Sequence, residues 1–127
     1  ELYSSQRTMK IPMKKKTGES ERVCPVEVAL NIIDGKWKLR ILYFLQDKTL
    51  RYYEIQEKIP AITQKVLTNQ LRQLEKDGIV TRRAYAEIPP RVEYSLTPVG
   101  EKLINVYKAL NTWALEYMDQ ELLRNQR

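Results

Sequence analysis

Apolar residues recur with a helical period in the middle of the chain. Leu67, Leu71 and Leu74 stand at i, i+4 and i+7, which places them on one face of a helix. Thr63 can cap the N-terminus of this helix, and Gly78 suits the left-handed position that follows a helix. The other faces carry polar side chains, namely Gln64, Lys65, Thr68, Asn69, Arg72 and Lys76. The pattern predicts a helix with one buried stripe and a polar, basic outer surface.

A β-hairpin is predicted directly after this helix. Residues 79–86 and 92–96 have the composition of two strands, and the five residues Glu87-Ile88-Pro89-Pro90-Arg91 join them. The short segment 48–51 could add an edge strand beside the hairpin.

A brief helix is predicted before the polar helix. It covers residues 52–58, with Ile55 and Ile59 buried, and Pro60-Ala61-Ile62 ends it. Two consecutive helices followed by a hairpin predict a winged helix-turn-helix. The fold class is therefore mainly α with a small β-hairpin (α+β), and the second helix is expected to lie in the major groove of DNA.

Two further helices are predicted nearer the N-terminus. Pro25 suits the first turn of the first helix, and an apolar stripe leads to the stop signal Asp34-Gly35. This stripe consists of Val26, Ala29, Leu30 and Ile33. The second helix is expected over about residues 36–46, with Trp37, Ile41, Leu42, Phe44 and Leu45 mostly inward and Lys36, Lys38 and Arg40 mostly outward.

The last helix is too apolar for a single core. Thr97-Pro98 starts it, and it is predicted to run to about Leu123. Its apolar residues cover more than one face, which favours a homodimer seam shared with the first helix. The residues expected there are Tyr107, Leu110, Trp113, Ala114, Tyr117 and Met118. The alternatives are a core helix with a wide stripe or the wall of a ligand pocket.

Charge is concentrated on the predicted DNA-reading half. The 127 residues carry a formal net charge of +6, and residues 36–83 hold eleven Lys or Arg against five Asp or Glu. Such clustering is typical of a polyanion partner, which double-stranded DNA would be, although RNA or an acidic membrane surface would fit it too. Residues 1–22 are expected to be a flexible basic tail, alternatively an arm that touches DNA, and residues 23–127 to be one domain.

Composition disfavours membrane and catalytic functions. No run approaches the ~20 apolar residues of a membrane span, and no signal peptide is evident, so a cytoplasmic protein is expected. Histidine is absent, cysteine occurs once and the four glycines are scattered. The usual nucleophilic triads, zinc sites and phosphate-binding loops are therefore not predicted, and we expect no enzyme, no metal and no cofactor.

The candidate DNA contacts come from three segments. The polar helix offers Thr63, Gln64, Lys65, Thr68, Asn69 and Arg72, the hairpin tip offers Arg91, and the start of the brief helix offers Arg51 and Tyr52. The helix set could instead be a solvated face, but no Asp or Glu lies between Ile59 and Leu74. Arg82 and Arg83 alternate along a strand, so at most one of them faces DNA.

Four separated motifs carry a resemblance to a known family. They are Cys24-Pro25-Val26-Glu27, Gly35-Lys36-Trp37, Leu67-Thr68 with residues 71–78 (LRQLEKDG), and residues 89–100 (PPRVEYSLTPVG). Over about residues 23–120 the chain resembles HxlR-type bacterial transcriptional regulators, which are similar in architecture to MarR-type regulators. The resemblance implies a dimeric winged-helix protein that represses or activates nearby genes, with repression as the main expectation. Thr63 and Lys65 stand where the family usually has Ser and Arg.

Cys24 has two interpretations. In part of this family the matching cysteine is a redox or electrophile sensor, and a helix N-terminus next to Arg22 favours the thiolate. Glu27 opposes this effect, and the chain has no second cysteine to resolve an oxidised thiol. A symmetric bridge across a dimer, a mixed disulfide or an alkylated thiol would be the products. The other interpretation is a passive capping or packing cysteine.

Two alternatives to DNA reading remain, a protein-interaction module and, less favoured, a small-molecule-binding or catalytic protein. A winged helix can serve as a protein-interaction module without sequence-specific DNA binding, and a weak, salt-insensitive affinity for duplex DNA would indicate it. A small-molecule or oxidant signal is a further candidate partner of the DNA-binding dimer.

Overall fold

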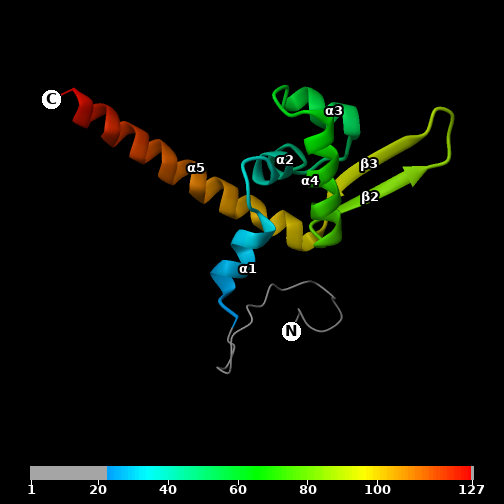
Figure 1. Cartoon of the computed structure of the whole chain (residues 1–127), viewed down its shortest axis with the longest axis horizontal. Helices are drawn as coiled ribbons and strands as arrows, with labels where there is room; N and C mark the ends of the chain where they lie inside the picture. The colour runs from blue at the N-terminus through cyan, green and yellow to red at the C-terminus, as the bar shows by residue number, and fades with distance from the viewer. Residues whose placement is uncertain (1–22, 127) are drawn as a thin grey trace.

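The computed structural model describes residues 23–126, and the prediction of a basic tail over residues 1–22 lies outside the described residues (Figure 1). The described part holds five helices and a three-stranded antiparallel sheet. In chain order the elements are α1 (Pro25–Ile32), α2 (Lys38–Phe44), β1 (Leu50–Arg51), α3 (Tyr52–Lys58), α4 (Gln64–Lys76), β2 (Val80–Tyr85), β3 (Arg91–Leu96) and α5 (Pro98–Asn125). The α+β winged helix-turn-helix is confirmed.

The hydrophobic core lies between α2, α3, α4 and the sheet. The predicted stripe of α4, Leu67, Leu71 and Leu74, is fully buried there. Ile55 and Ile59 of the α3 region are buried as well. These side chains hold α3 and α4 together, so the outer surface of α4 is fixed relative to the sheet.

The sheet has the strand order β1-β3-β2, and the predicted edge strand is confirmed as β1. In the register, Leu50 of β1 and Arg82 of β2 both pair with Tyr94, which is buried. Arg51 and Arg83 both pair with the next residue, Glu93. Because successive side chains of a strand point to opposite faces, the first row faces the helices and the second faces away from them.

Both ends of α4 and the start of α5 follow the predicted capping signals. The Thr63 hydroxyl accepts a hydrogen bond of 3.2 Å from the backbone N–H of Val66. Gly78 has a φ of +75°, the left-handed conformation that favours glycine. The Thr97 hydroxyl accepts from the N–H of Gly100 at 3.1 Å and donates to the carbonyl of Gly78 at 2.8 Å. Thr97 thereby caps α5 and ties it to the end of α4.

The second helix differs from the prediction at both ends and on one face. It spans Lys38–Phe44 rather than residues 36–46, because residues 35–37 form a turn. The prediction that Lys38 points outward is wrong, since its side chain is only 2% exposed. Its ammonium group is held by Asp34 Oδ1 at 2.9 Å and by Gln73 Oε1 at 2.6 Å, and these partners compensate its removal from water.

α5 extends away from the rest of the molecule after its first turns (Figure 1). Ile104 is buried in the core, and Tyr107 stacks on Tyr43 of α2 with ring centroids 4.6 Å apart. Beyond that point the helix has no buried residue. α1 likewise buries none of its residues. Within residues 23–126, no helix combines the length and the apolarity that crossing a membrane requires.

Candidate nucleic-acid interface

One side of α4 presents most of the predicted DNA contacts together. Gln64, Lys65, Asn69 and Arg72 are exposed, and Thr68 is half-buried. The five side chains, with Val66, line one open hollow along the helix. Thr63 is exposed at the N-cap, where its hydroxyl is already an acceptor for the helix backbone. Amides and cations in one row offer both base-reading donors and phosphate ligands.

Tyr52 fixes α4 against α3. Its hydroxyl donates to the carbonyl oxygen of Gln64 at 3.0 Å and lies 3.0 Å from Thr68 Oγ1. A tyrosine hydroxyl has one proton, so with that proton on the Gln64 carbonyl the Thr68 hydroxyl donates to Tyr52. Two of the predicted DNA contacts, Tyr52 and Thr68, are therefore engaged within the protein.

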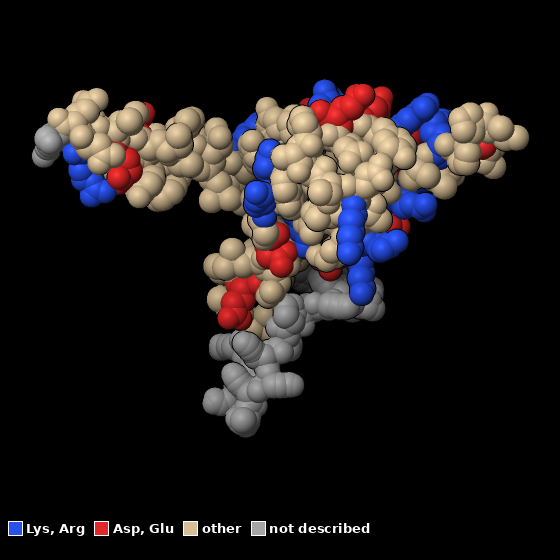
Figure 2. Space-filling view, turned by 45° about the horizontal axis from the view of Figure 1, so that its top comes forward, with Lys and Arg blue, Asp and Glu red and all other residues tan. Residues whose placement is uncertain are grey.

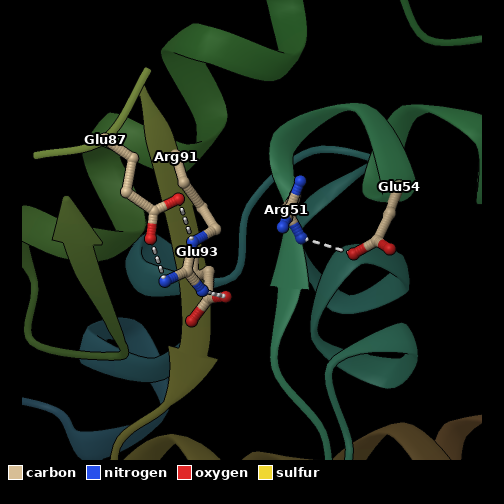
Figure 3. A network of polar contacts seen from close by, with 5 residues as sticks. All are labelled: Arg51, Glu54, Glu87, Arg91 and Glu93. Carbon is tan, nitrogen blue, oxygen red and sulfur yellow. Dashed lines mark hydrogen bonds and ion pairs between the residues drawn. The ribbon is translucent and has the colours of Figure 1, made fainter. Parts of the chain in front are cut away.

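Arg51 stands at the N-cap of α3 with its side chain exposed. Its backbone N–H donates to Glu54 Oε1 at 2.7 Å (Figure 3). This bond caps the helix and leaves the guanidinium available for a partner outside the chain.

Arg91 lies in a strand, not at the hairpin tip as the sequence suggested. It is the first residue of β3 and pairs with Tyr85, whereas Ile88, 98% exposed, occupies the tip. Figure 3 shows its guanidinium between the carboxylates of Glu87 and Glu93, at 2.7 and 2.6 Å. The same group lies 3.8 Å from the centroid of the Tyr85 ring. The charge of this arginine is therefore compensated within the hairpin.

The ion pair shifts the pKa values of both partners. Hydrogen bonding to the Arg91 guanidinium lowers the pKa of Glu87, and hydrogen bonding to Glu87 raises the pKa of Arg91. Both groups therefore stay charged through the neutral range, so the pair persists there.

Two further residues of this region escaped the sequence-based prediction. Arg82 shares a hollow with Arg72 of α4, on the helix side of the sheet. The alternation of Arg82 and Arg83 was visible in the sequence, but only the pairing of Arg82 with buried Tyr94 decides its side. The other residue is Gln73, whose role as the partner of Lys38 had no local signal.

Lys and Arg side chains gather around the region from which the β2–β3 hairpin projects (Figure 2). The first half of α5, on the other side of the molecule, lacks this concentration of charge in the same view. Further Lys and Arg side chains lie on the side of the body nearer to α5 in this view, so the basic surface is not confined to the hairpin.

The predicted seam residues fall into two groups. Leu110, Trp113, Tyr117 and Met118 are exposed, whereas Tyr107 and Ala114 are half-buried. The rings of Trp113 and Tyr117 stack with centroids 5.2 Å apart. Four further apolar residues of the same helix are exposed, namely Val106, Leu115, Leu122 and Leu123.

Cys24 occupies the N-cap position of α1, is exposed, and makes no side-chain capping bond. The thiol therefore does not cap α1, and the choice between a sensor and a passive cysteine stays a prediction.

Known proteins resemble this chain over most of its length. An uncharacterized HTH-type transcriptional regulator of Methanothermobacter thermautotrophicus is 49% identical over 100 residues, which make up 79% of this chain and 76% of that protein. The HTH-type transcriptional regulator YdeP of Bacillus subtilis, also uncharacterized, is 47% identical over 97 residues, 76% of each chain.

Solved structures of two regulators are also similar to this chain. The redox regulator HypR in its reduced form has a TM-score of 0.71 and 44% identity, and the match covers 76% of this chain and 95% of that one. The reduced form of the transcriptional regulator YodB from Bacillus subtilis has a TM-score of 0.64 and 37% identity, covering 73% and 94%.

The family described as HxlR-like helix-turn-helix matches residues 32–122. The match runs from the end of α1, through the helix-turn-helix and the hairpin, to most of α5. The chain therefore belongs to the HxlR-like helix-turn-helix family of transcriptional regulators.

Proposed function

We propose that the chain binds a palindromic operator in duplex DNA as a homodimer and acts there as a repressor. The observation that carries the proposal is the outer side of α4. Gln64, Lys65, Asn69 and Arg72 are exposed on one helix that has no acidic residue before Glu75. Surfaces that are merely solvated usually mix both signs of charge, whereas this one offers donors and cations only.

The two helices of the motif are suited to read DNA as one unit. The bonds of Tyr52 to Gln64 and Thr68 hold α4 by its N-terminal turns, the part of such a helix that meets base edges. α4 can then enter the major groove while α3 crosses the backbone. Arg51 and Arg91 are the proposed phosphate contacts on the two sides of α4. To contact a phosphate, Arg91 has to leave the carboxylates of Glu87 and Glu93.

The dimer is proposed from the apolar surface of α5 together with α1. Trp113, with 61% of its side chain exposed, stands near the middle of that surface, and the exposed Val26 and Leu30 add the face of α1. A monomer that exposes such a patch is unusual, and a second copy of the chain buries it most economically. Two α4 helices ~34 Å apart then read the two halves of a palindrome.

The direct test selects duplex fragments with the pure protein and measures affinity against salt. We expect a palindromic consensus and a loss of about 10³ to 10⁵ in affinity between 50 and 200 mM salt, for ~6 to 10 phosphate contacts. Transcription in vitro from a promoter carrying that consensus should fall when the protein is added. Affinity that does not change with salt would favour a protein-interaction module instead.

Trp113→Glu tests the dimer separately. Placing a carboxylate in the apolar surface should give monomers in sedimentation at micromolar concentration and weaken operator binding strongly. Asn105→Glu, at an exposed position of the same helix whose neighbours at three and four residues are not seam residues, is the matched control and should keep the dimer. Equal sedimentation of both variants and the wild type would contradict the proposed seam.

A second candidate function is response to oxidants or electrophiles. It is favoured by the exposed Cys24 thiol at the start of α1 and by the similarity to a protein described as a redox regulator. A bridge or adduct at Cys24 would displace α1, and with it the seam that sets the distance between the two α4 helices.

The test uses diamide or a quinone. Operator affinity of the wild type should change, and a dimer-sized band or a mass shift should appear at Cys24, reversed by reductant in the disulfide case. Cys24→Ser should bind the operator normally and lose the response. If both proteins respond alike, Cys24 is not the sensor.

A further inference from the structure

We infer that Arg72 of α4 and Arg82 of β2 form a two-arginine phosphate site between α4 and the β2–β3 hairpin. The inference rests on the proposed DNA binding and specifies one of its ligands, a phosphate of the DNA backbone. Neither the sequence pattern nor the family resemblance singled out Arg82 as a contact.

The strand register places Arg82 on the helix side of the sheet. It pairs with Tyr94, which is 8% exposed and part of the core. Arg83 pairs with Glu93 and therefore points to the opposite face, where Glu93 already binds Arg91. Two adjacent arginines of one strand thus have different neighbours.

Arg72 and Arg82 meet at one hollow of about 420 Å³. Its other lining residues are Tyr52, Thr68, Glu75 and Tyr94. In residues 23–126, neither of the two arginines forms an ion pair, in contrast to Arg91 with its two carboxylates. Glu75 supplies one negative charge against two positive charges, so the hollow keeps an excess of positive charge.

Two of the hydroxyl groups that line the hollow, those of Tyr52 and Thr68, are already used as donors. The Tyr52 proton goes to the Gln64 carbonyl and the Thr68 hydroxyl donates to Tyr52, so neither hydroxyl has a proton left for a ligand. The guanidinium groups keep their planar pairs of N–H donors, which match the oxygens of a phosphate. The chemistry of the hollow therefore selects an oxyanion.

Continuity with α4 identifies the source of that phosphate. Arg72 lines this hollow and also the open hollow along the exposed donors Gln64 and Asn69. A duplex whose base edges face those donors brings its backbone past Arg72 and toward the hairpin. A backbone phosphate is the occupant we assign, and free inorganic phosphate is the competing source with the same chemistry.

The experiment compares Arg82→Gln with Arg83→Gln, two exposed adjacent positions with the same loss of charge. Arg82→Gln should weaken binding to all duplex sequences about 10-fold, since a charge-assisted hydrogen bond is lost, and Arg83→Gln less than about 2-fold. The slope of log affinity against log salt concentration is about 0.9 for each phosphate contacted. If both arginines hold one phosphate, the Arg72→Gln/Arg82→Gln double variant should therefore reduce this slope by about 0.9 and not by twice that. Equal effects of Arg82→Gln and Arg83→Gln would overturn the site.

Two further measurements identify the ligand. In the first, single backbone phosphates of the duplex are replaced one at a time by neutral methylphosphonates. When the phosphate held by the two arginines is replaced, the wild type and Arg82→Gln should bind that duplex equally. Without DNA, inorganic phosphate is titrated against chloride at equal ionic strength while the Nε–Hε signals of Arg72 and Arg82 are followed by NMR. If the wild type binds no duplex, the proposed function fails, and this titration still decides the site: shifts confined to the two arginines keep it as a free-phosphate site, and unshifted signals overturn it.

Discussion

Lys38 Nζ donates a hydrogen bond of 2.6 Å to Gln73 Oε1, which joins the start of α2 to the inner side of α4. The same ammonium group donates to Asp34 Oδ1 at 2.9 Å, in the turn after α1. Lys38 is 2% exposed, whereas the Asp34 side chain is 62% exposed. One buried cation therefore holds three segments of the chain together.

This arrangement predicts an asymmetric response to substitution. Asp34→Ala removes the only carboxylate paired with the buried ammonium group in the described residues, and we expect a loss of about 1 to 3 kcal/mol in the free energy of unfolding. Lys38→Met removes the buried charge itself and leaves Asp34 in water, so it should cost less. When Asp34→Ala is added to Lys38→Met, the free energy of unfolding should fall no further, because no buried charge is left without a partner. Urea unfolding of the four proteins checks this order, and an equal cost of Asp34→Ala in both backgrounds would contradict it.

Reading of bases should depend on the amides of α4. Asn69→Ala or Gln64→Ala should relax preference at particular base pairs by about 1 to 3 kcal/mol, because each side chain can pair with an adenine edge. Gln70→Ala is a matched control, since Gln70 is half-buried on the same helix and does not line its open hollow. The affinity of each variant is measured for every single-base change of the operator, which gives its base preference at each position. An unchanged preference profile in Asn69→Ala would mean that α4 is oriented differently on DNA.

Compensation of Arg91 by Glu87 and Glu93 should limit its contact with DNA. Glu87→Gln removes one of the two carboxylates, so affinity for all duplexes should rise and the salt slope should steepen by up to about 0.9. Arg91→Ala should weaken binding to all sequences evenly, since a phosphate or groove contact is lost without base specificity. Anisotropy titrations at several salt concentrations measure both effects. A Glu87→Gln protein with wild-type affinity would indicate that Arg91 does not touch DNA.

The same pair predicts a pH dependence. The pKa of Glu87 is lowered in the folded hairpin, so the stabilisation from the pair is present above the ordinary carboxyl range and is lost as the pH falls through the lowered value. Arg91 keeps its charge over this range, because its pKa is raised. In Arg91→Gln, the pKa of Glu87 should return toward that of an ordinary glutamate. Carboxyl chemical shifts in an NMR pH titration provide the measurement.

Gly100 should tolerate no larger side chain. A Cβ at this position in the first turn of α5 would overlap the carbonyl oxygen of Ile79, so Gly100→Ala should lose about 1 to 3 kcal/mol of stability through crowding. Gly35 is a contrasting case, because its φ is +85° and a Cβ there meets no atom within 4 Å. Asn accepts this conformation better than Ala, so Gly35→Asn should be milder than Gly35→Ala. Gly100→Asn should bring no such relief, and thermal unfolding distinguishes the two positions.

The sequence by itself determined most of the helices and strands and their order. The spacing of Leu67, Leu71 and Leu74 predicted the buried stripe of α4, and Thr63 and Gly78 predicted its ends. Such signals are local: a capping hydroxyl or a left-handed glycine acts on atoms within a few residues along the chain. The family resemblance came from the same kind of information, since its motifs are short and contiguous.

Only the tertiary structure decided how individual charged side chains are used. Lys38 looks like a solvated residue until Gln73, 35 positions away, supplies an acceptor in the interior. Arg82 and Arg83 are equivalent in sequence until pairing with β3 assigns them to opposite faces, and Arg91 looks like a free tip residue until Glu87 and Glu93 converge on it. Burial, register and ion pairing depend on the positions of atoms that packing brings together from separate elements, and no local spacing in the chain encodes those distances.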